Sequence, residues 1–576
     1  MGKAIGIDLG TTYSVVAIAE NGHVQVIQNA EGDRLTPSVY AESADGHIMV
    51  GAIAKNQASA NPGRTVSSVK RLMGSNARIP VNGRSLSPQE ISAHILRKIK
   101  ADVKRQLGED VSRAVITVPA YFSDAQRRAT QEAGKMAGFE IMRIISEPTA
   151  AALAYGLNRS DIQNILVWDL GGGTFDVSIL EVGDGLFHVR AVNGDTHLGG
   201  DDWDAQLVSY LKQQILKIHD RDIESNACMF QQVKEACERI KRELSVQDES
   251  HIFLPLIAEP HHDAIEIEMT VSRQVFEDLT QDILNMLIPP TRQALKDAAL
   301  TPADMDRIIL VGGATRMPAV RRLAETLFQQ PPDTRLNPDE VVAVGAAIQA
   351  GVLNGSVQDA VLIDVTPLSL GIETQGGLFT RLISRNTTIP VSAGRIFTNA
   401  EDNQTVMDFN VLQGEREMVR DNISLGSFQL TDIPMLHRGK AHVEVTFEID
   451  VNGILQVSAQ ELHTGESAGI KIDAVHLLSG DQINRAVAEA AVNAIADSQR
   501  RSEIETSIQT NHLIQAAEAL LFGTARRLSK VSRRKIHAAI SEAKSALAGG
   551  QSEAMIQASQ ELTTVLNSLQ ENCERA

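Results

Sequence analysis

Two short stretches of this sequence repeat one pattern that suits phosphate chemistry. Residues 5–12 and 166–174 are each an apolar run closed by Asp-Leu-Gly and then by glycine or hydroxyl residues. Glycines permit a tight turn and a close approach to a ligand, and consecutive N–H groups there form an anion-binding concavity. Asp8 and Asp169 place beside each turn the hard oxygen that hydrated Mg²⁺ prefers. Two facing hairpins of this kind would hold one nucleotide's phosphates from both sides, whereas the plainer alternative is two ordinary strand–turn units.

Alternating strand-like and helix-like segments surround these motifs and predict an α/β domain. Strands are expected at residues 15–19, 24–28, 114–118, 165–169, 177–182, 187–192 and 307–311. Helices are expected at residues 88–107, 124–138, 147–157, 203–219, 230–245, 273–299, 318–328 and 339–351. Because the Asp-Leu-Gly turn occurs twice, we expect this α/β domain to consist of two related halves, with the boundary between them near residue 160.

The character of the sequence changes near Asn354. Residues 359–364 are a short apolar run between two aspartates, which fits either an edge strand or an interdomain linker that docks into a groove. From residue 368 to about residue 461 the pattern indicates strands with frequent turns, since apolar and polar side chains alternate over residues 443–449. Asn452-Gly453 then offers a hairpin turn. An antiparallel β domain is therefore expected here.

The sequence after residue 479 is rich in Ala, Glu, Gln, Lys and Arg, which are good helix formers. Ser479 and Gln482 have the spacing of a capping box, and glycines at 523 and 549–550 divide the C-terminal stretch into segments. We expect a helical C-terminal part that needs the β domain to bury one of its faces.

Composition bounds the class of protein. A chain of 576 residues should form several domains, and its net charge of −18 argues against a nucleic-acid binder. Three cysteines, Cys228, Cys237 and Cys573, cannot build a disulfide framework, so a reducing compartment fits. The first strand begins by about the fourth residue, which leaves no room for a signal peptide, and no stretch approaches a membrane span. We expect a cytoplasmic protein without membrane contact.

The sequence has neither a Gly-x-x-x-x-Gly-Lys-Ser/Thr loop nor a kinase signature, so a nucleotide would be held in another way. Residues 5–12, 169–176 and 309–318 resemble the three signature motifs of the DnaK-type, 70-kDa heat-shock chaperones. Residues 147–156 and 364–371 match that family as well, and the resemblance covers essentially the whole chain.

The resemblance implies a multidomain fold. Residues 1–356 would form an actin-like (ribonuclease H-like) α/β ATPase domain of two lobes with ATP between them. An interdomain linker over 357–367, an antiparallel β-sandwich peptide-binding domain over 368–476 and an α-helical lid over 477–576 would follow. The implied function is that of an ATP-dependent chaperone of protein folding and the stress response, in which ATP hydrolysis controls peptide capture through linker docking and lid movement.

The resemblance also assigns residues to ATP or ADP and Mg²⁺, with K⁺ as a further candidate cation. Lys70 would reach the γ-phosphate and help to place the attacking water, and Glu147 would lie near that water and the magnesium. Without the resemblance, Lys70 would be a solvated lysine and Glu147 a helix-start carboxylate. The implied catalytic set is Asp8, Lys70, Glu147, Asp169 and Thr174, with Asp8 and Asp169 holding the metal through water.

The implied nucleotide-binding set contains both phosphate loops and an adenosine pocket. Glu238, Lys241 and Ser245 share one helical face that could bond ribose hydroxyls, while arginine planes could stack on the base. From the residues alone, 238–245 would be an exposed charged helix. The full set is Gly10, Thr11, Thr12, Tyr13, Gly171, Gly172, Gly173, Gly199, Gly200, Glu238, Lys241, Arg242, Ser245, Gly312, Gly313, Arg316 and Asp339.

The resemblance also implies sites for a bound peptide and for co-chaperones. The residues assigned to the peptide pocket could instead belong to the ordinary core of the β-sandwich. The peptide-pocket positions are Ile372, Gln375, Phe397, Ala400, Met407 and Phe409. The docking linker is Val361, Leu362, Ile363 and Asp364, and a J-domain partner would be sensed through Arg127 and Arg143 together with Asp364. The implied partners are unfolded or partly folded polypeptides, a J-domain co-chaperone and a nucleotide exchange factor, with no nucleic acid, and the chain would be mainly monomeric.

The sequence departs from the family in places. Gln375 stands where DnaK members carry methionine, and Met407 and Phe409 are bulkier than usual. The segment between Gly74 and Pro88 and the loop at residues 183–185 are short, which puts dependence on the usual exchange factor in doubt. These features resemble specialised bacterial members such as the HscC-like group.

Three other classes share parts of the pattern. A small-molecule kinase or an actin-like filament protein would leave the chain after residue 368 unexplained. The third class is a family member that binds partners but no longer passes through an ATP hydrolysis cycle. The intact Lys70, Glu147, Asp169 and Thr174 argue against it.

Overall fold

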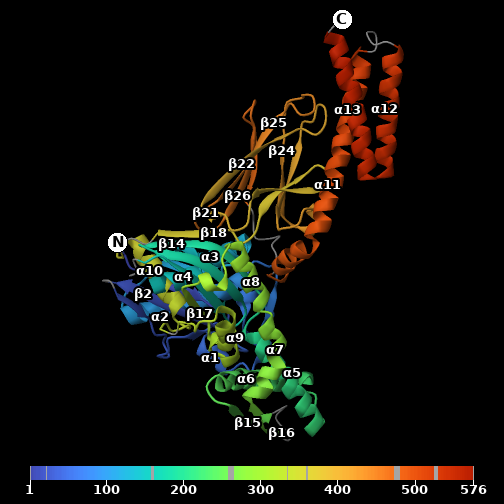
Figure 1. Cartoon of the computed structure of the whole chain (residues 1–576). Helices are drawn as coiled ribbons and strands as arrows, with labels where there is room; N and C mark the ends of the chain where they lie inside the picture. The colour runs from blue at the N-terminus through green and yellow to red at the C-terminus, as the bar shows by residue number, and fades with distance from the viewer. Residues whose placement is uncertain are drawn as a thin grey trace. The chain divides into compact units, whose positions relative to one another are not determined.

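The computed structural model describes residues 2–20, 23–156, 161–256, 265–333, 335–357, 361–471, 480–524 and 530–574 (Figure 1). The chain divides into two compact units. The first comprises Met1–Ser369, Ile383–Phe397 and His442–Asn484, and the second comprises Leu370–Leu382, Thr398–Ala441 and Arg485–Ala576. Among the described helices, none combines the length and the apolar content needed to cross a bilayer.

Two mixed sheets of the first unit share a four-strand order, with β10-β1-β2-β3 in one corresponding to β17-β12-β13-β14 in the other. The first sheet, in the order β11-β10-β1-β2-β3, contains β1 (Ala4–Leu9), β2 (Tyr13–Glu20), β3 (His23–Val26), β10 (Arg113–Val118) and β11 (Glu140–Ser146), with β4 (Thr36–Pro37) beside β2. The second, in the order β17-β12-β13-β14-β18-β21, contains β12 (Gln163–Leu170), β13 (Phe175–Gly183), β14 (Leu186–Asp195), β17 (Arg307–Val311), β18 (Val361–Val365) and β21 (Thr388–Ile389).

The strand pairing agrees with two related halves. Strand β1 is antiparallel to β2 and parallel to β10, and β12 is likewise antiparallel to β13 and parallel to β17. Each motif therefore forms the turn of an antiparallel hairpin: β1–β2 is the first hairpin and β12–β13 the second. Their strands are almost wholly buried, as the continuous apolar runs predict.

The helices of the first unit mostly follow the expected pattern. They are α1 (Ala52–Asn56), α2 (Pro88–Leu107), α3 (Asp124–Met136), α4 (Glu147–Gly156), α5 (Gly200–His219), α6 (Ala227–Leu244), α7 (Arg273–Asn285), α8 (Ile288–Asp297), α9 (Pro318–Phe328) and α10 (Val341–Asn354). Helix α2 has the predicted bounds because local signals fix both ends: a capping box of Ser87 and Glu90, Pro88 in the first turn, and Gly108 in the left-handed conformation after the last.

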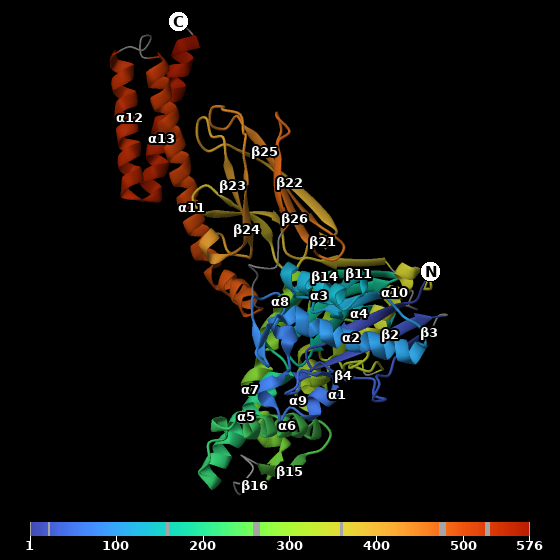
Figure 2. The same cartoon turned by 180° about the vertical axis from the view of Figure 1, so that it is seen from behind.

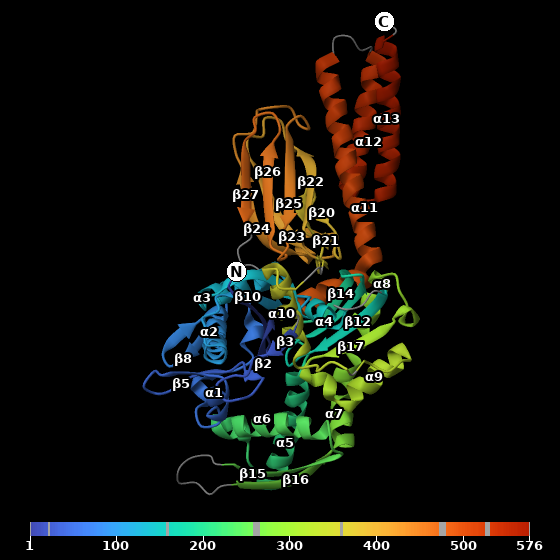
Figure 3. The ribbon, with the colours of Figure 1, turned by 90° about the vertical axis from the view of Figure 1, so that its left-hand side faces the viewer.

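Helices α4 and α10 pack together between the two sheets (Figure 3). A Cβ added to Gly345 of α10 would lie 1.7 Å from the carbonyl oxygen of Ala150 in α4, so the two helices touch backbone to backbone. A Cβ on Gly6 of β1 would lie 2.0 Å from the backbone nitrogen of Ala347. The first hairpin is thus pressed directly against α10, which fixes its turn relative to the second sheet.

Several expectations about local structure need correction. The single helix expected over residues 273–299 is wrong, since α7 and α8 are separated at Met286 and Leu287. Pro289 and Pro290 explain this break, because proline offers no N–H and disfavours helix in the residue before it. Strand β11 and the paired strands β15 (Glu249–Leu256) and β16 (Ile265–Ser272) were not expected. Residue 157, the expected end of α4, lies outside the described residues.

Smaller strands complete the first half. They are β5 (Tyr40–Glu42), β6 (Ile48–Val50), β7 (Thr65–Val66), β8 (Ile79–Val81) and β9 (Arg84–Leu86).

Short 3-10 turns occur throughout the described chain. They are η1 (Pro62–Arg64), η2 (Val69–Leu72), η3 (Ile223–Ser225), η4 (Pro302–Asp304), η5 (Gly313–Arg316) and η6 (Val419–Asp421). Of these, η2 matters most for the site because it carries Lys70.

The expected linker forms strand β18. It runs parallel to β14, with Leu362 opposite Phe187, and antiparallel to β21, with Asp364 opposite Ile389. Leu362 and Val365 belong to the same buried cluster as α4 and α10. The segment is therefore a docked strand with a neighbour on each side, and not an edge strand.

The β-rich region forms two four-stranded sheets. In the first unit, β22 (Val391–Thr398), β25 (His442–Ile449), β26 (Leu455–Glu461) and β27 (Ser467–Lys471) are joined in that order. Alternate side chains of β25, from Val443 to Ile449, are buried, and Asn452-Gly453 turns into β26, which confirms the predicted hairpin. In the second unit the order is β20 (Leu378–Ile383), β19 (Leu370–Thr374), β23 (Met407–Gln413) and β24 (Ile423–Leu430).

The C-terminal part is helical, as expected. Helices α11 (Gly480–Thr524), α12 (Lys530–Gly549) and α13 (Ser552–Glu574) are separated close to the predicted glycines, and the latter part of α11 packs beside α12 and α13 around Ile514, Ile540 and Leu562 (Figures 1 and 2). Ser479 of the expected capping box lies outside the described residues. Within the second unit, Arg416 makes a buried ion pair with Asp497 of α11 at 2.5 Å.

Candidate nucleotide site

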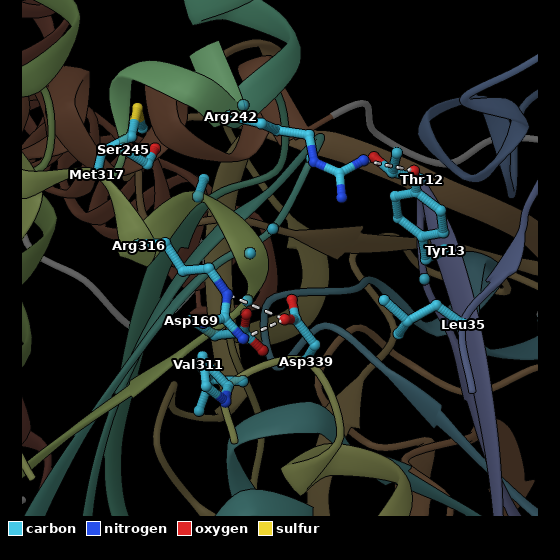
Figure 4. A pocket seen from close by; sticks show the side chains of 18 of the residues that line it. Thr12, Tyr13, Leu35, Asp169, Arg242, Ser245, Val311, Arg316, Met317 and Asp339 are labelled. Atoms are coloured by element: carbon cyan, nitrogen blue, oxygen red, sulfur yellow. Dashed lines mark hydrogen bonds and ion pairs between the residues drawn. The ribbon is translucent and has the colours of Figure 1, made fainter. Parts of the chain in front are cut away.

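A cavity of 590 Å³ lies in the first unit, where the two hairpin turns meet α6 and η5 (Figure 4). It is lined mainly by residues that the sequence had singled out. Those are Asp8, Gly10, Thr12, Tyr13, Glu147, Asp169, Gly171, Gly172, Gly200, Glu238, Lys241, Arg242, Ser245, Gly312, Gly313, Arg316 and Asp339. Segments far apart in the chain therefore converge on one site.

The two hairpin turns face each other at close range. A Cβ added to Gly172 would lie 1.9 Å from Thr12 Oγ1, so only glycine allows this approach. A Cβ on Gly199 would meet the backbone of Gly172 at 2.5 Å. The N–H of Gly171 donates to the carbonyl of Thr174 at 3.0 Å, which closes the second turn. These contacts give the facing arrangement that phosphate binding from both sides requires.

Five expected residues do not line the cavity. Thr11 and Thr174 are buried, and a Cβ on Gly173 would lie 2.8 Å from Thr11 Cγ2, so these three belong to the packing behind the turns. Gly199 lies against the second turn as described above. The fifth, Lys70, is buried and bonds Glu147, which itself lines the cavity.

Buried carboxylates gather at the phosphate end. Burial, followed by the charge of Glu147, raises the pKa of Asp8 to about 7 and the pKa of Asp169 well above its usual value. Asp176, which pairs across the second hairpin with Asp169, also has its pKa raised to about 7 by burial and by Glu147. Lys70 is the cation that opposes these shifts at all three groups.

This donor set fits a hydrated Mg²⁺. Carboxylate oxygens are its preferred ligands, and the cluster carries more negative charge than Lys70 alone can balance. Asp176 Oδ2 is buried without a hydrogen-bond partner among the described residues. Among the described residues, no group of three His, Cys, Asp or Glu side chains is arranged to hold a metal ion directly.

The end of the cavity where adenosine was expected is built on α6. Glu238 accepts two hydrogen bonds from Lys55 Nζ, both at 2.8 Å, and Tyr13 Oη lies 3.1 Å from the same ammonium. Burial raises the pKa of Glu238, but Lys55 outweighs it, and the net pKa is lowered. Arg242 donates to Tyr13 Oη at 3.3 Å. These bonds connect α6 of the second half to the first hairpin across the mouth of the cavity.

A second arginine approaches from η5. Arg316 Nε donates to Asp339 Oδ2 at 3.0 Å (Figure 4), and its Nη2 donates to Asn337 at 2.9 Å. Gly312, with φ +83°, permits the turn that aims η5 at the cavity; a Cβ there would lie 2.4 Å from the carbonyl oxygen of Leu170. Two guanidinium groups, from Arg242 and Arg316, thus line one cavity, as flat-base recognition requires.

Sequence reasoning missed the apolar lining of the cavity and Arg321, and it also missed four charged residues that lie beside the cavity without lining it. Asp176 could have been found, because a tight turn after Asp169 makes these two carboxylates cross-strand partners. Lys55 is a lone lysine with no local signal. Arg71, whose Nη2 donates to Asp202 Oδ2 at 2.8 Å, and Asp204, which pairs with Lys241, depend on contacts between distant elements.

Of the two arginines expected to sense a J-domain partner, only Arg143 has an interaction with β18 among the described residues, through the charge of Asp364. Arg127 is buried and donates to the carbonyls of Ala120 and Phe122, both at 3.3 Å. Burial lowers the pKa of Arg143, while the charges of Asp364 and Asp450 oppose that shift. Arg143 therefore sits in the field of the linker carboxylate.

The expected peptide-pocket residues fall in both units. In the second unit Ile372, Met407 and Phe409 are buried, and Gln375 and Ala400 are exposed. Phe409 stacks on Phe428 with ring centroids 5.2 Å apart. Half-buried Phe397 belongs to β22 of the first unit.

Two sheets that share one strand order, with a cavity where their hairpin turns meet, define an α/β protein with two related halves. A family model described as "Hsp70 protein" matches residues 4–575, so this chain belongs to the 70-kDa heat-shock protein family. Members of that family are ATP-dependent chaperones that bind ATP or ADP with Mg²⁺, unfolded polypeptides and co-chaperones. The family combines an actin-like ATPase domain with a β-sandwich and a helical lid, and the sheets and helices described above are consistent with that layout.

Proposed function

We propose that this chain is a DnaK-type chaperone in which ATP hydrolysis controls the capture and release of extended hydrophobic segments of unfolded proteins. One observation carries the proposal: the first unit contains both the nucleotide cavity and strand β18, docked in the second sheet. A change in lobe closure around the nucleotide can therefore alter the docking of the segment that leads into the β-rich region.

The proposed reaction is the attack of water on the γ-phosphate of ATP. Backbone N–H groups of the two turns hold the phosphates, and Lys70 stabilises charge on the transferring group. Glu147, fixed by its ion pair with Lys70, orients the attacking water. Mg²⁺, held through water by Asp8 and Asp169, would neutralise phosphate charge.

The proposed coupling follows the linker. With ATP bound, the lobes close and β18 docks. The lid over 477–576 then separates from the peptide-binding domain over 368–476, so that peptide exchanges quickly. After hydrolysis β18 is released from the ATPase domain over 1–356, and the lid closes. The structure has β18 docked and also has α11 packed on the β19–β20 turn, where a Cβ on Gly376 would lie 2.6 Å from Ile504 Cγ2. The proposed separation of the lid would break this contact.

Partners and location form the finer part of the proposal. A J-domain protein would accelerate hydrolysis through Arg127, Arg143 and Asp364, and an exchange factor remains a candidate partner. The bulky Met407 and Phe409 suggest a shallow pocket and a narrow range of clients, as in a specialised bacterial member. The proposed compartment is the bacterial cytoplasm.

The test is the dissociation rate of a labelled, leucine-centred peptide from the full-length protein, measured in ADP and then in excess ATP. Release that is much faster in ATP is the expected result and requires both sites and their coupling. Tight binding without an ATP effect would refute the coupling. Absence of binding in both states, with ATP turnover intact, would refute the general peptide pocket.

A further inference from the structure

Asp204 is a partly buried carboxylate, with a side chain 17% exposed, that lies beside the cavity and does not line it. It is in the first turns of α5, and its Oδ2 accepts from Lys241 Nζ of α6 at 2.6 Å. Its Oδ1 is buried and has no hydrogen-bond partner among the described residues. A buried carboxylate oxygen without a hydrogen-bond partner is costly and calls for an explanation.

The partner of Asp204 does line the cavity. Lys241 Nζ also donates to the carbonyl oxygen of Gly200 at 2.9 Å. An ammonium group has three N–H donors, so these two bonds leave one donor for a ligand in the cavity. The helices that carry Asp204 and Lys241 share one buried core through Trp203, Leu207 and Ile240, so the pair is held on a rigid base.

Without Asp204, Lys241 would have a competing partner. Glu238 lies three residues earlier on α6, at a spacing that brings the two side chains together. Glu238 is already bonded by Lys55, which connects the two halves. Asp204 therefore keeps Lys241 away from Glu238 and leaves both groups available to a ligand.

We propose that Asp204 is a positioning residue for ribose recognition: it anchors the ammonium of Lys241 so that the remaining N–H faces a ribose hydroxyl of the bound nucleotide. The proposal rests on the proposed function, because it assumes that the cavity binds adenine nucleotides. It deepens that function by naming what fixes Lys241.

The test compares ADP with 2′,3′-dideoxy-ADP by calorimetric titration of the full-length protein with Mg²⁺. Asp204→Asn should weaken ADP binding roughly tenfold, as expected when the acceptor of the Lys241 bond loses its charge, and should weaken dideoxy-ADP binding less than about twofold. In a Lys241→Ala background, Asp204→Asn should cause no further loss of ADP affinity. Asp220→Asn, at the exposed C-terminal end of α5, removes the same charge and should leave both affinities unchanged.

Two results would overturn the proposal: equal weakening for both nucleotides, or an undiminished effect of Asp204→Asn in the Lys241→Ala background. If the wild-type protein binds neither nucleotide, the proposed function itself fails, which is a different outcome. If Asp204→Asn does not fold, Asp204→Glu keeps the charge but displaces Lys241, and it must show the same selective loss for ADP.

The acid range gives a second readout. Burial raises the pKa of Asp204 to about 6. Lys241 opposes this shift, whereas Asp201 and Glu238 add to it. The Cys237 thiol also faces Asp204. Protonation of Asp204 removes the anchor, so the preference for ADP over dideoxy-ADP should decline as pH falls through about 6. The Asp204→Asn variant should show no such decline, and a decline of wild-type size in that variant would contradict the assignment.

Discussion

Lys70 combines burial, an ion pair and a place behind the phosphate end of the cavity. Because its proposed role is to stabilise charge on the transferring phosphoryl group, Lys70→Ala should lower the rate of ATP turnover about 100-fold, as loss of one preorganised donor does. Thr174→Ala should also slow turnover. ADP affinity should change little, since adenosine is held elsewhere. Steady-state phosphate release measures the rate.

The control is Lys104→Ala on the exposed face of α2, which should turn over ATP at the wild-type rate. Removal of Lys70 leaves Glu147 buried and unpaired, so thermal unfolding must show that the variant is folded at the assay temperature. Unchanged turnover in a folded Lys70→Ala protein would refute the site assignment.

Asp8 and Asp176 should make the metal-free protein less stable as pH rises. Their pKa values are raised to about 7 in the folded chain from about 3.8 unfolded, so the folded state binds more protons between these values. Stability is thus fully present below the unfolded pKa and is lost as pH rises through the folded one. The slope is at most about 1.4 kcal/mol per pH unit for each group.

Thermal unfolding in EDTA between pH 5 and pH 8, at roughly one-unit steps across this window, measures the effect. Asp176→Asn should flatten the decline, because its amide stays neutral at every pH. A wild-type protein whose unfolding temperature stays level or rises across this range would contradict the pKa assignments.

At the scale of elements, the packing of α10 on α4 depends on Gly345. Alanine has the higher helix propensity, by about 1 kcal/mol, so Gly345→Ala would stabilise an isolated helix. In the folded protein its Cβ would lie 1.7 Å from the carbonyl oxygen of Ala150, and overpacking of this kind costs about 1–3 kcal/mol or more. The variant should therefore unfold at a lower temperature than the wild type.

Gly63→Ala is the matched control, because nothing lies within 4 Å of its added Cβ. That variant should unfold at the wild-type temperature or slightly above it. Equal stability of the Gly345→Ala protein and the wild type would show that α4 and α10 can separate without cost.

Strand β18 offers a test of coupling. Leu362 is 9% exposed and shares a buried cluster with α4 and α10, so Leu362→Asp should undock the strand. We expect the variant to turn over ATP but to release peptide at the same rate in ATP and in ADP. Leu353→Asp, at a side chain 42% exposed near the end of α10, should retain the acceleration by ATP.

Elements with strong local signals could be predicted from the sequence. The hairpin turns, α2 with its caps, and the alternating strand β25 are all specified by short stretches. Predicting Asp204 or Lys55 from the sequence was not possible, because their roles arise where α5 or α1 meets α6. The break between α7 and α8 could have been predicted from the sequence, because Pro289 and Pro290 lie inside the expected helix.

At the scale of the whole molecule, the chain passes repeatedly between its two compact units, at residues 369–370, 382–383, 397–398, 441–442 and 484–485. The nucleotide cavity lies wholly in the first unit. A ligand stabilises only the cooperative unit that binds it, so the two units should respond differently to nucleotide.

Calorimetric unfolding of the full-length protein should therefore show two transitions. Saturating Mg²⁺ and ADP should raise the temperature of only one of them. At a ligand concentration 1,000 times the Kd, the stabilisation should be about 4 kcal/mol. Asp204→Asn should reduce this increment at a fixed ADP concentration, because it weakens binding, while the other transition stays where it is. A single transition, or equal shifts in both, would mean that the two units unfold as one body, and peptide release would then have to be explained without independent motion of the units.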